Sequence, residues 1–199
     1  MNIFEALRES HELQRSYCRR MLASRKAPIR EALFLQLKVE LMAHAVAEER
    51  HLYVPLLMTD GGLDASRHAL KDHREIGQLC DELSVSDKES SAWLAKAKEL
   101  AYEVRDHLKE EESRFFQLAG RQLPDAKKAP LGSRYLRELV RMRRKYAEQY
   151  QTVAVDAGGD LEGSGRGAGV RSAQRTGAAR KLRAKASQKA ARRAATQAR

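Results

Sequence analysis

A histidine and a glutamate stand four residues apart inside an otherwise apolar helical stripe. In the run LMAHAVAEERHLYVPLL, His44 and Glu48 share a helix face with Leu41 and Leu52. An unpaired ionised carboxylate is so unfavourable in an apolar interior that chains normally expose or neutralise it. If this stripe faces a core, something must compensate the charge of Glu48.

The same His-x-x-x-Glu insertion occurs again, 63 residues further along the chain. This shift superposes His44 on His107 and Glu48 on Glu111. The flanking residues match as well, and the aligned pairs are Leu37 with Leu100, Leu41 with Val104, Glu49 with Glu112, Leu52 with Phe115 and Tyr53 with Phe116. Because a histidine and a glutamate are energetically unfavourable in an apolar stripe, their recurrence at matching positions indicates one shared function.

Two further stripes carry one histidine each: His11 recurs at helical spacing with Leu7, and His73 does so with Ile76. A lone core histidine is usually just hydrogen-bonded, and a lone His-x-x-x-Glu is usually a solvated pair. Six such residues on the core stripes of four consecutive helices instead predict a metal site, and they are His11, His44, Glu48, His73, His107 and Glu111.

Metal binding explains why these residue types occur together. Residues at i and i+4 present a nitrogen and an oxygen to one point, carboxylates can bridge two ions, and imidazoles can fill terminal positions. Mixed histidine and carboxylate ligands suit iron, manganese or zinc. The cations would compensate the buried carboxylates, and four histidines with two glutamates are enough for two ions.

The elements that must position these residues read as helices, without β-type alternation. We expect helices over residues 3–25, 28–58, 63–83 and 89–119. Pro28 can open the second of them, Pro55 predicts a kink or an early end, and Gly120 predicts a C-terminal stop. Short connections make successive helices antiparallel neighbours, so residues 1–120 are predicted to form an all-α, up-down-up-down four-helix bundle.

Residues 121–150 are predicted to hold a linker and an additional helix over residues 132–150, which packs by its tyrosine side. Residues 151–199 contain 11 of the 38 Lys and Arg residues but only three of the 27 acidic ones, and almost no large apolar residues. We expect this segment to be a disordered, low-complexity basic tail.

The composition of the tail suits nucleic-acid binding without sequence preference, because its cations can neutralise phosphates. The candidate contacts are Arg180, Lys181, Arg183, Lys185, Lys189, Arg192 and Arg193. The alternative is a solvated segment with no specific partner, since aromatic stacking residues and base-reading motifs are absent from it.

We expect a cytoplasmic protein that does not associate with membranes, because the sequence lacks a long apolar run and a signal-like start. Cys18 and Cys80 form no CxxC motif, and both fall on apolar stripes, so they are predicted to be buried free thiols. The sequence indicates no oligomeric state.

The runs HAVAEERHLYVPL and HLKEEESRFFQL, with His11 and His73, resemble the hemerythrin-like, or HHE cation-binding, family over about residues 1–120. The resemblance implies a four-helix bundle that holds two non-haem iron ions as a di-iron centre with an oxo or hydroxo bridge. Carried over by position, the ligands would be the six residues named above. Known roles in the family are oxygen carriage, oxygen or redox sensing, iron sensing and peroxide decomposition.

The sequence departs from the oxygen carriers of this family, which place His-x-x-x-His on the third helix. Here the positions four residues either side of His73 hold Ala69 and Gly77. His68 lies about 140° round the helix from His73 and is expected at the surface, whereas His51 lies only about 20° from His44. Each is a candidate additional ligand, or a partner that supports a ligand.

If neither histidine ligates, one metal ion has an open position, which favours ligand access over guarded oxygen carriage. The leading hypothesis is a di-iron protein that binds or senses O2, peroxide, nitric oxide or iron status. One alternative is an enzyme that decomposes hydrogen peroxide, and another is a nucleic-acid-associated protein that acts through its tail. The sequence leaves open whether the protein is an enzyme.

Overall fold

The computed structural model describes residues 1–159, which are helical and contain no strand. The elements are α1 (Ile3–Ala23), α2 (Ala27–Glu48), η1 (Glu49–Tyr53), α3 (Val54–Leu56), α4 (Gly62–Ser84), α5 (Ser91–Glu110), η2 (Glu111–Phe115), α6 (Phe116–Gln122) and α7 (Asp125–Gly159). None of the described helices has the length and apolar character needed to cross a bilayer.

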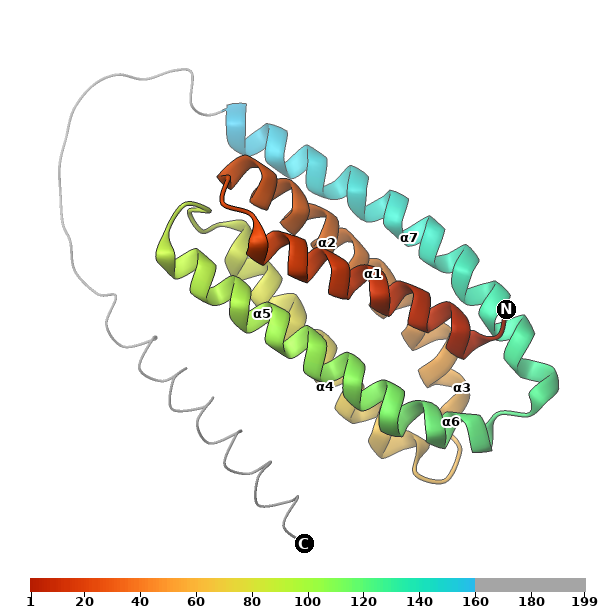
Figure 1. Cartoon of the computed structure of the whole chain (residues 1–199). Helices are drawn as coiled ribbons and strands as arrows, with labels where there is room; N and C mark the ends of the chain where they lie inside the picture. The colour runs from red at the N-terminus through yellow and green to blue at the C-terminus, as the bar shows by residue number, and fades with distance from the viewer. Residues whose placement is uncertain (160–199) are drawn as a thin grey trace, which may run out of the picture. The chain divides into compact units, whose positions relative to one another are not determined.

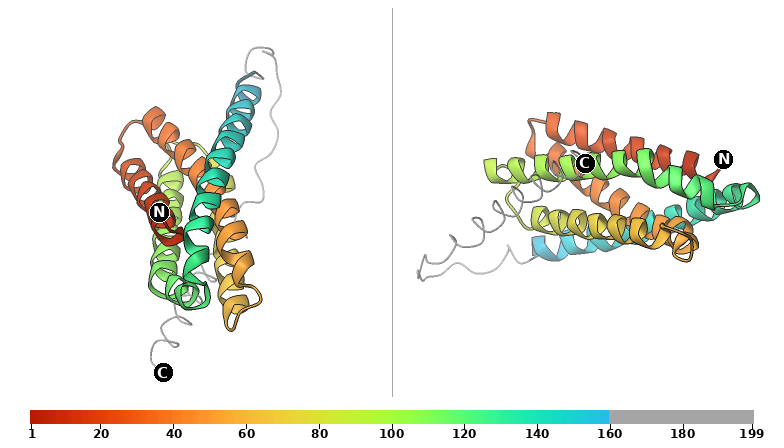
Figure 2. Two further views of the ribbon diagram at one scale, coloured as in Figure 1. Left: turned by 90° about the vertical axis from the view of Figure 1, so that its right-hand side faces the viewer. Right: turned by 90° about the horizontal axis from the view of Figure 1, so that it is seen from below.

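The predicted bundle with an additional helix is confirmed. Helix α1 packs against α2 and α5, while α4 packs against α5 and α2. Helix α7 lies along α1 and α2, with its longest contact on α2 (Figure 1). Figure 2 shows the bundle from two further directions, and in its left view the long helices are inclined to one another. The fifth helix is therefore part of the packed structure.

The helix boundaries follow local signals in the sequence. Asn2 caps α1 and forms a capping box with Glu5, and Pro28 lies in the first turn of α2. The segment that follows α2 ends just after Pro55, as expected. Gly61, with a φ of 73°, then turns the chain into α4, in a backbone conformation that favours glycine.

The two predicted boundaries on either side of Pro124 were wrong. The fourth helix does not stop at Gly120 but continues through Gln122, and the chain becomes extended at Leu123 because Pro124 follows. Helix α7 begins directly afterwards at Asp125, ahead of the predicted start, and accommodates Pro130 in its early turns. Packing against α1 and α2 outweighs the helix-breaking tendency of this proline.

A π-helical turn, which the sequence did not predict, begins directly after Glu48 in the first His-x-x-x-Glu motif and at Glu111 in the second. In η1 the amide of Val54 donates to the carbonyl of Glu49, and in η2 Phe116 donates to Glu111 in the same way. The wider turn shifts the buried face by one residue, so Ala119 is fully buried and Leu118 is only partly buried.

The apolar core forms two clusters with the polar residues between them along each helix. One cluster includes Leu7, Leu52 and Phe115, and the other includes Met21 and Trp93. The cysteines behave as predicted: Cys18 and Cys80 are free and buried. Burial raises the pKa of each thiol to about 12, which leaves both thiols unreactive.

The predictions for the basic tail fall largely outside the described residues. Helix α7 continues to Gly159, so the prediction that the disordered tail begins at residue 151 was wrong for residues 151–159. The candidate nucleic-acid contacts all lie beyond the described residues, and they are Arg180, Lys181, Arg183, Lys185, Lys189, Arg192 and Arg193. Their role and the expected disorder of residues 160–199 stay predictions.

Candidate metal centre

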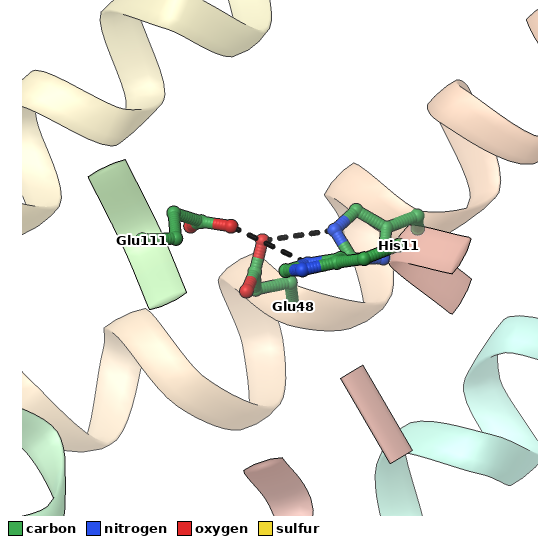
Figure 3. A group of neighbouring side chains, drawn as sticks. His11, Glu48 and Glu111 are labelled. Carbon is green, nitrogen blue, oxygen red and sulfur yellow. Dashed lines mark ion pairs between the residues drawn. The ribbon is translucent and has the colours of Figure 1, made fainter. Parts of the chain in front are cut away.

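Four histidines and two glutamates converge at the middle of the bundle. They form two groups that share Glu48 and Glu111, and within each group the candidate ligand atoms all lie within 4.8 Å of one another. We name the group with His11 and His44 the α1 cluster, and the group with His73 and His107 the α4 cluster. Figure 3 shows His11, Glu48 and Glu111 directed toward one another from three different helices.

Each of the four imidazoles directs its Nε2 atom toward the two carboxylates. The distances to Glu48 Oε2 are 3.2 Å from His44 and 3.6 Å from His73. The distances to Glu111 Oε2 are 3.5 Å from both His11 and His107. All four ring nitrogens therefore face the same small volume, as helical i, i+4 spacing predicted for two of the pairs.

The other ring nitrogen of each histidine faces an oxygen from a neighbouring residue. His11 Nδ1 lies 2.7 Å from Glu112 Oε1, and His73 Nδ1 lies 3.2 Å from Glu49 Oε1. His44 Nδ1 has two such oxygens and His107 Nδ1 faces Asp72, as described below. An oxygen at Nδ1 favours the tautomer whose Nε2 carries no proton, which is the form that can bind a metal.

Four buried atoms at this point have no hydrogen-bond partner. They are Nε2 of His11, Nε2 of His44, Oε1 of Glu48 and Oε2 of Glu111. Buried polar atoms are nearly always paired, so unpaired donors and acceptors that converge are unusual in a core. The donor set and its unpaired atoms fit metal ions that would bind between them.

The electrostatics of the cluster also fit bound cations. Burial lowers the pKa of the His11 imidazole to about 4, which keeps it neutral. Burial and the neighbouring Glu48 carboxylate raise the pKa of Glu111 to about 8. Although burial opposes ionisation of Glu48, interactions with His44 and His73 lower its pKa to about 2. Two buried carboxylates this close can both be ionised only if cations offset their charges.

The sequence model of the hemerythrin HHE cation binding domain matches residues 2–119. The chain belongs to this family. Among solved structures, it is similar to a hemerythrin HHE cation binding domain-containing protein from Mycobacterium kansasii, with 21% identity and a TM-score of 0.64. The match covers 73% of this chain and 89% of that one, and it shows a shared fold. A search of curated protein sequences finds no match.

Tyr53 is a site residue of the HHE domain that sequence reasoning missed. Its hydroxyl donates to Glu48 Oε2 at 2.9 Å, makes a short contact with Glu111 and lies 3.5 Å from His73 Nε2. The π-helical turn η1 brings the residue five positions after Glu48 onto the same face. The sequence contained one hint of this role, because Tyr53 carries a hydroxyl at the position that Phe116 occupies in the second copy of the motif.

Helix α7 reaches the centre although it lies beyond the matched HHE domain. Tyr135 Oη is 2.8 Å from His44 Nδ1, and Ser10 Oγ is 3.1 Å from the same atom. Ser10 also donates to buried Glu40 at 2.6 Å, and Arg143 of α7 holds this carboxylate with two hydrogen bonds of 2.6 and 2.7 Å. The tyrosine side of this helix was predicted to pack, but no role at the site was expected for it.

The α4 cluster borders a cavity of about 300 Å³, to which His107 and Glu111 both contribute. Asp72 lines the same cavity, and its Oδ2 lies 3.7 Å from His107 Nδ1. Sequence reasoning missed Asp72, which stands one residue before His73 and carried no separate signal. The cavity gives small molecules a route toward one side of the centre.

The structure places the two remaining candidate histidines outside both clusters. Burial lowers the pKa of His51, and the charges of Glu138 and Arg134 on α7 also act on it. The π-helical turn rotates this part of the helix away from the direction expected for a regular α-helix. His68 is half exposed and lies beside Asp72 and Glu110 in a separate group.

Proposed function

We propose that the HHE domain of this protein holds a non-haem centre of two iron ions and uses it to bind or sense a small ligand. The observation that carries the proposal is the pair of clusters that share Glu48 and Glu111, with four unpartnered buried atoms directed into them. Imidazole with carboxylate is a ligand set that suits iron, manganese or zinc, and resemblance to di-iron relatives favours iron.

Each cluster offers ligands for one ion. His11 and His44 would hold the first, His73 and His107 would hold the second, and Glu48 with Glu111 would serve both. Tyr53 contacts both carboxylates and can orient them, and its oxygen is available as a further donor. The residues at Nδ1 of each histidine would hold the ring planes in place while Nε2 binds.

The ligand class is a small molecule such as O2, peroxide or nitric oxide, with iron status as a further possible signal. The bound ions would supply the redox chemistry. The chain itself supplies a site with an apolar core on either side, imidazole ligands and a cavity of small-molecule size beside His107. This combination admits a small ligand while most of the centre stays buried.

Decomposition of hydrogen peroxide to water and O2 is the second candidate function. Two observations favour it: the cavity beside the α4 cluster, and the lack of a histidine four residues either side of His73, where Ala69 and Gly77 stand. Turnover of peroxide by purified, iron-loaded protein separates the candidates. O2 release far above that of free iron supports the enzyme, and its absence supports the binding or sensing role.

A nucleic-acid role for the C-terminal segment is a separate proposal that rests on its charge alone. Residues 163–199 contain no acidic residue. The full chain is expected to bind duplex DNA at low salt and to release it steeply as salt rises. A protein that ends at Tyr150 should bind far less and keep its metal, and equal DNA affinity of the two proteins would contradict the proposal.

Metal analysis combined with an absorption spectrum tests the main proposal directly. Purified protein is expected to contain two irons per chain and to show charge-transfer bands in the near ultraviolet. A single ion per chain, or a protein that binds no iron when loaded under anaerobic conditions, would contradict the di-iron assignment.

A further inference from the structure

A third group of metal-ligating side chains lies at the mouth of the cavity. His68 and Asp72 stand one turn apart on α4, and Glu110 ends α5 opposite them. His68 Nε2 lies 3.3 Å from Glu110 Oε2 and 3.8 Å from Asp72 Oδ2, and the three candidate ligand atoms all lie within 4.8 Å of one another. We name these residues the outer cluster.

The outer cluster differs from the two inner clusters in its exposure and charge. The side chain of His68 is 46% exposed, that of Glu110 is 31% exposed and that of Asp72 is 9% exposed. Two carboxylates face one imidazole, and Arg114 Nη1 lies 3.4 Å from Glu110 Oε1. Arg114 is 72% exposed, so it can move away when another cation binds.

One cavity joins the outer cluster to the inner centre. His68, Asp72 and Glu110 line it together with His107 and Glu111. Glu111 is almost fully buried, and its Oε2 has no hydrogen-bond partner. Asp72 Oδ2 lies between the two regions, at 3.8 Å from His68 and 3.7 Å from His107. Three protein ligands leave some coordination positions of an ion to water, and the cavity volume of about 300 Å³ has room for such water molecules.

We propose that the outer cluster binds a divalent transition-metal ion, and that ions bind at this site before they reach the α4 cluster. One imidazole and two carboxylates are ligands that Fe²⁺, Mn²⁺ and Zn²⁺ accept. Partial exposure makes binding weaker and exchange faster than at the buried centre, as loading requires. The existence of the outer site stands on its own residues, whereas its loading role rests on the proposed inner centre.

Titration with Mn²⁺ tests the site in the full chain after its inner centre has been filled with iron. Electron paramagnetic resonance of free Mn²⁺ counts the bound ions. One additional, weak equivalent is expected. His68→Ala and Glu110→Gln should each weaken it at least about tenfold, because each removes a ligand. Arg114→Gln should tighten it about two- to fivefold, because a competing positive charge is lost.

His51→Ala is the matched control, since it removes a histidine that lies in no cluster. It should bind Mn²⁺ like the unaltered protein. The outer site is refuted if the iron-filled protein binds no further equivalent, or if His68→Ala and Glu110→Gln retain it at full affinity.

The loading role is tested by the rate of Fe²⁺ uptake into metal-free protein. Iron that stays bound after rapid gel filtration is measured against time. His68→Ala and Glu110→Gln should take up iron several-fold more slowly and reach the same final content as the His51→Ala control. Unchanged rates would overturn the loading role. A final content below two in unaltered protein would instead count against the proposed di-iron centre, so the two failures are distinguishable.

Discussion

The α1 and α4 clusters each contain the histidine of one His-x-x-x-Glu motif, but their surroundings differ. In the α1 cluster, His11 and His44 are almost fully buried, and Tyr135 of α7 covers His44. In the α4 cluster, His73 has the partly exposed Glu49 as its partner, and His107 borders the cavity. Helix α7, which lies outside the matched HHE domain, therefore contributes to the difference in surroundings between the two clusters.

Because of this difference, the two proposed ions should differ in affinity and in exchange rate. The α1 cluster has two oxygens at His44 Nδ1, and neither of its histidines lines the cavity beside His107, so an ion there should be held tightly and exchange slowly. The α4 cluster is reached through a cavity with carboxylates at its mouth. An ion there should exchange faster and be the one that meets a small ligand.

The largest effect is expected for the glutamates that the clusters share. Glu48→Ala and Glu111→Ala should each lose at least one ion and lower the melting temperature of the metal-bound protein by about 10 °C, because binding free energy contributes to folding. Metal analysis and thermal unfolding measure both effects. Exposed Glu9→Ala is the control, and unchanged metal content in both variants would refute these ligands.

Chelation should separate the clusters by rate. A chelator is expected to remove iron from the unaltered protein in a fast and a slow phase, one for each cluster. His107→Ala should abolish the fast phase, and His11→Ala should abolish the slow phase, because each removes a ligand from one cluster. Absorbance of the iron chelate gives the phases. If both variants lose the same phase, the proposed inequality of the clusters is wrong.

The contribution of α7 is tested by removing one hydroxyl. Tyr135→Phe keeps the packed ring but deletes the oxygen at His44 Nδ1, so affinity for the slowly exchanging ion should fall about tenfold or more. The fast phase of chelation should be unchanged. Tyr146→Phe, on the same helix but only partly buried, is the matched control. A Tyr135→Phe protein with both phases intact would show that α7 only packs.

The smallest effect is expected for His51, which sequence spacing made a candidate ligand. His51→Ala should keep both ions and change the free energy of unfolding by no more than about 0.5 kcal/mol, as partly exposed positions generally do. Metal content and denaturant unfolding are the measurements. Loss of an ion would mean that the α1 cluster has a third histidine, and that the comparison of the clusters needs revision.

The helical pattern of the sequence predicted the fold, and the motif spacing predicted that the six polar side chains would meet in the core, where the structure brings them together. A four-residue spacing places His44 with Glu48 and His107 with Glu111 on common faces whatever the rest of the fold does. Apolar stripes on four helices with short connections leave few arrangements other than an antiparallel bundle. Their shared core then forces the polar residues of every stripe into one interior layer.

The outer partners of the histidines could not be predicted in this way. Tyr53 reaches the carboxylates only because a π-helical turn follows Glu48, and that turn has no clear signature in the sequence. Asp72 and Tyr135 approach their histidines from other helices. Such contacts depend on how helices rotate and slide against each other, which a pattern on one helix does not contain.

The pattern of apolar and polar residues therefore sets which residues enter the core layer, because helical periodicity is a local property of the chain. It also determined that a compensating partner is needed, because buried carboxylates are unfavourable in isolation. Only the tertiary structure decided which side of the centre is covered and which is open. That outcome depends on where α7 packs and where a cavity remains between α4 and α5, and both result from contacts between distant segments.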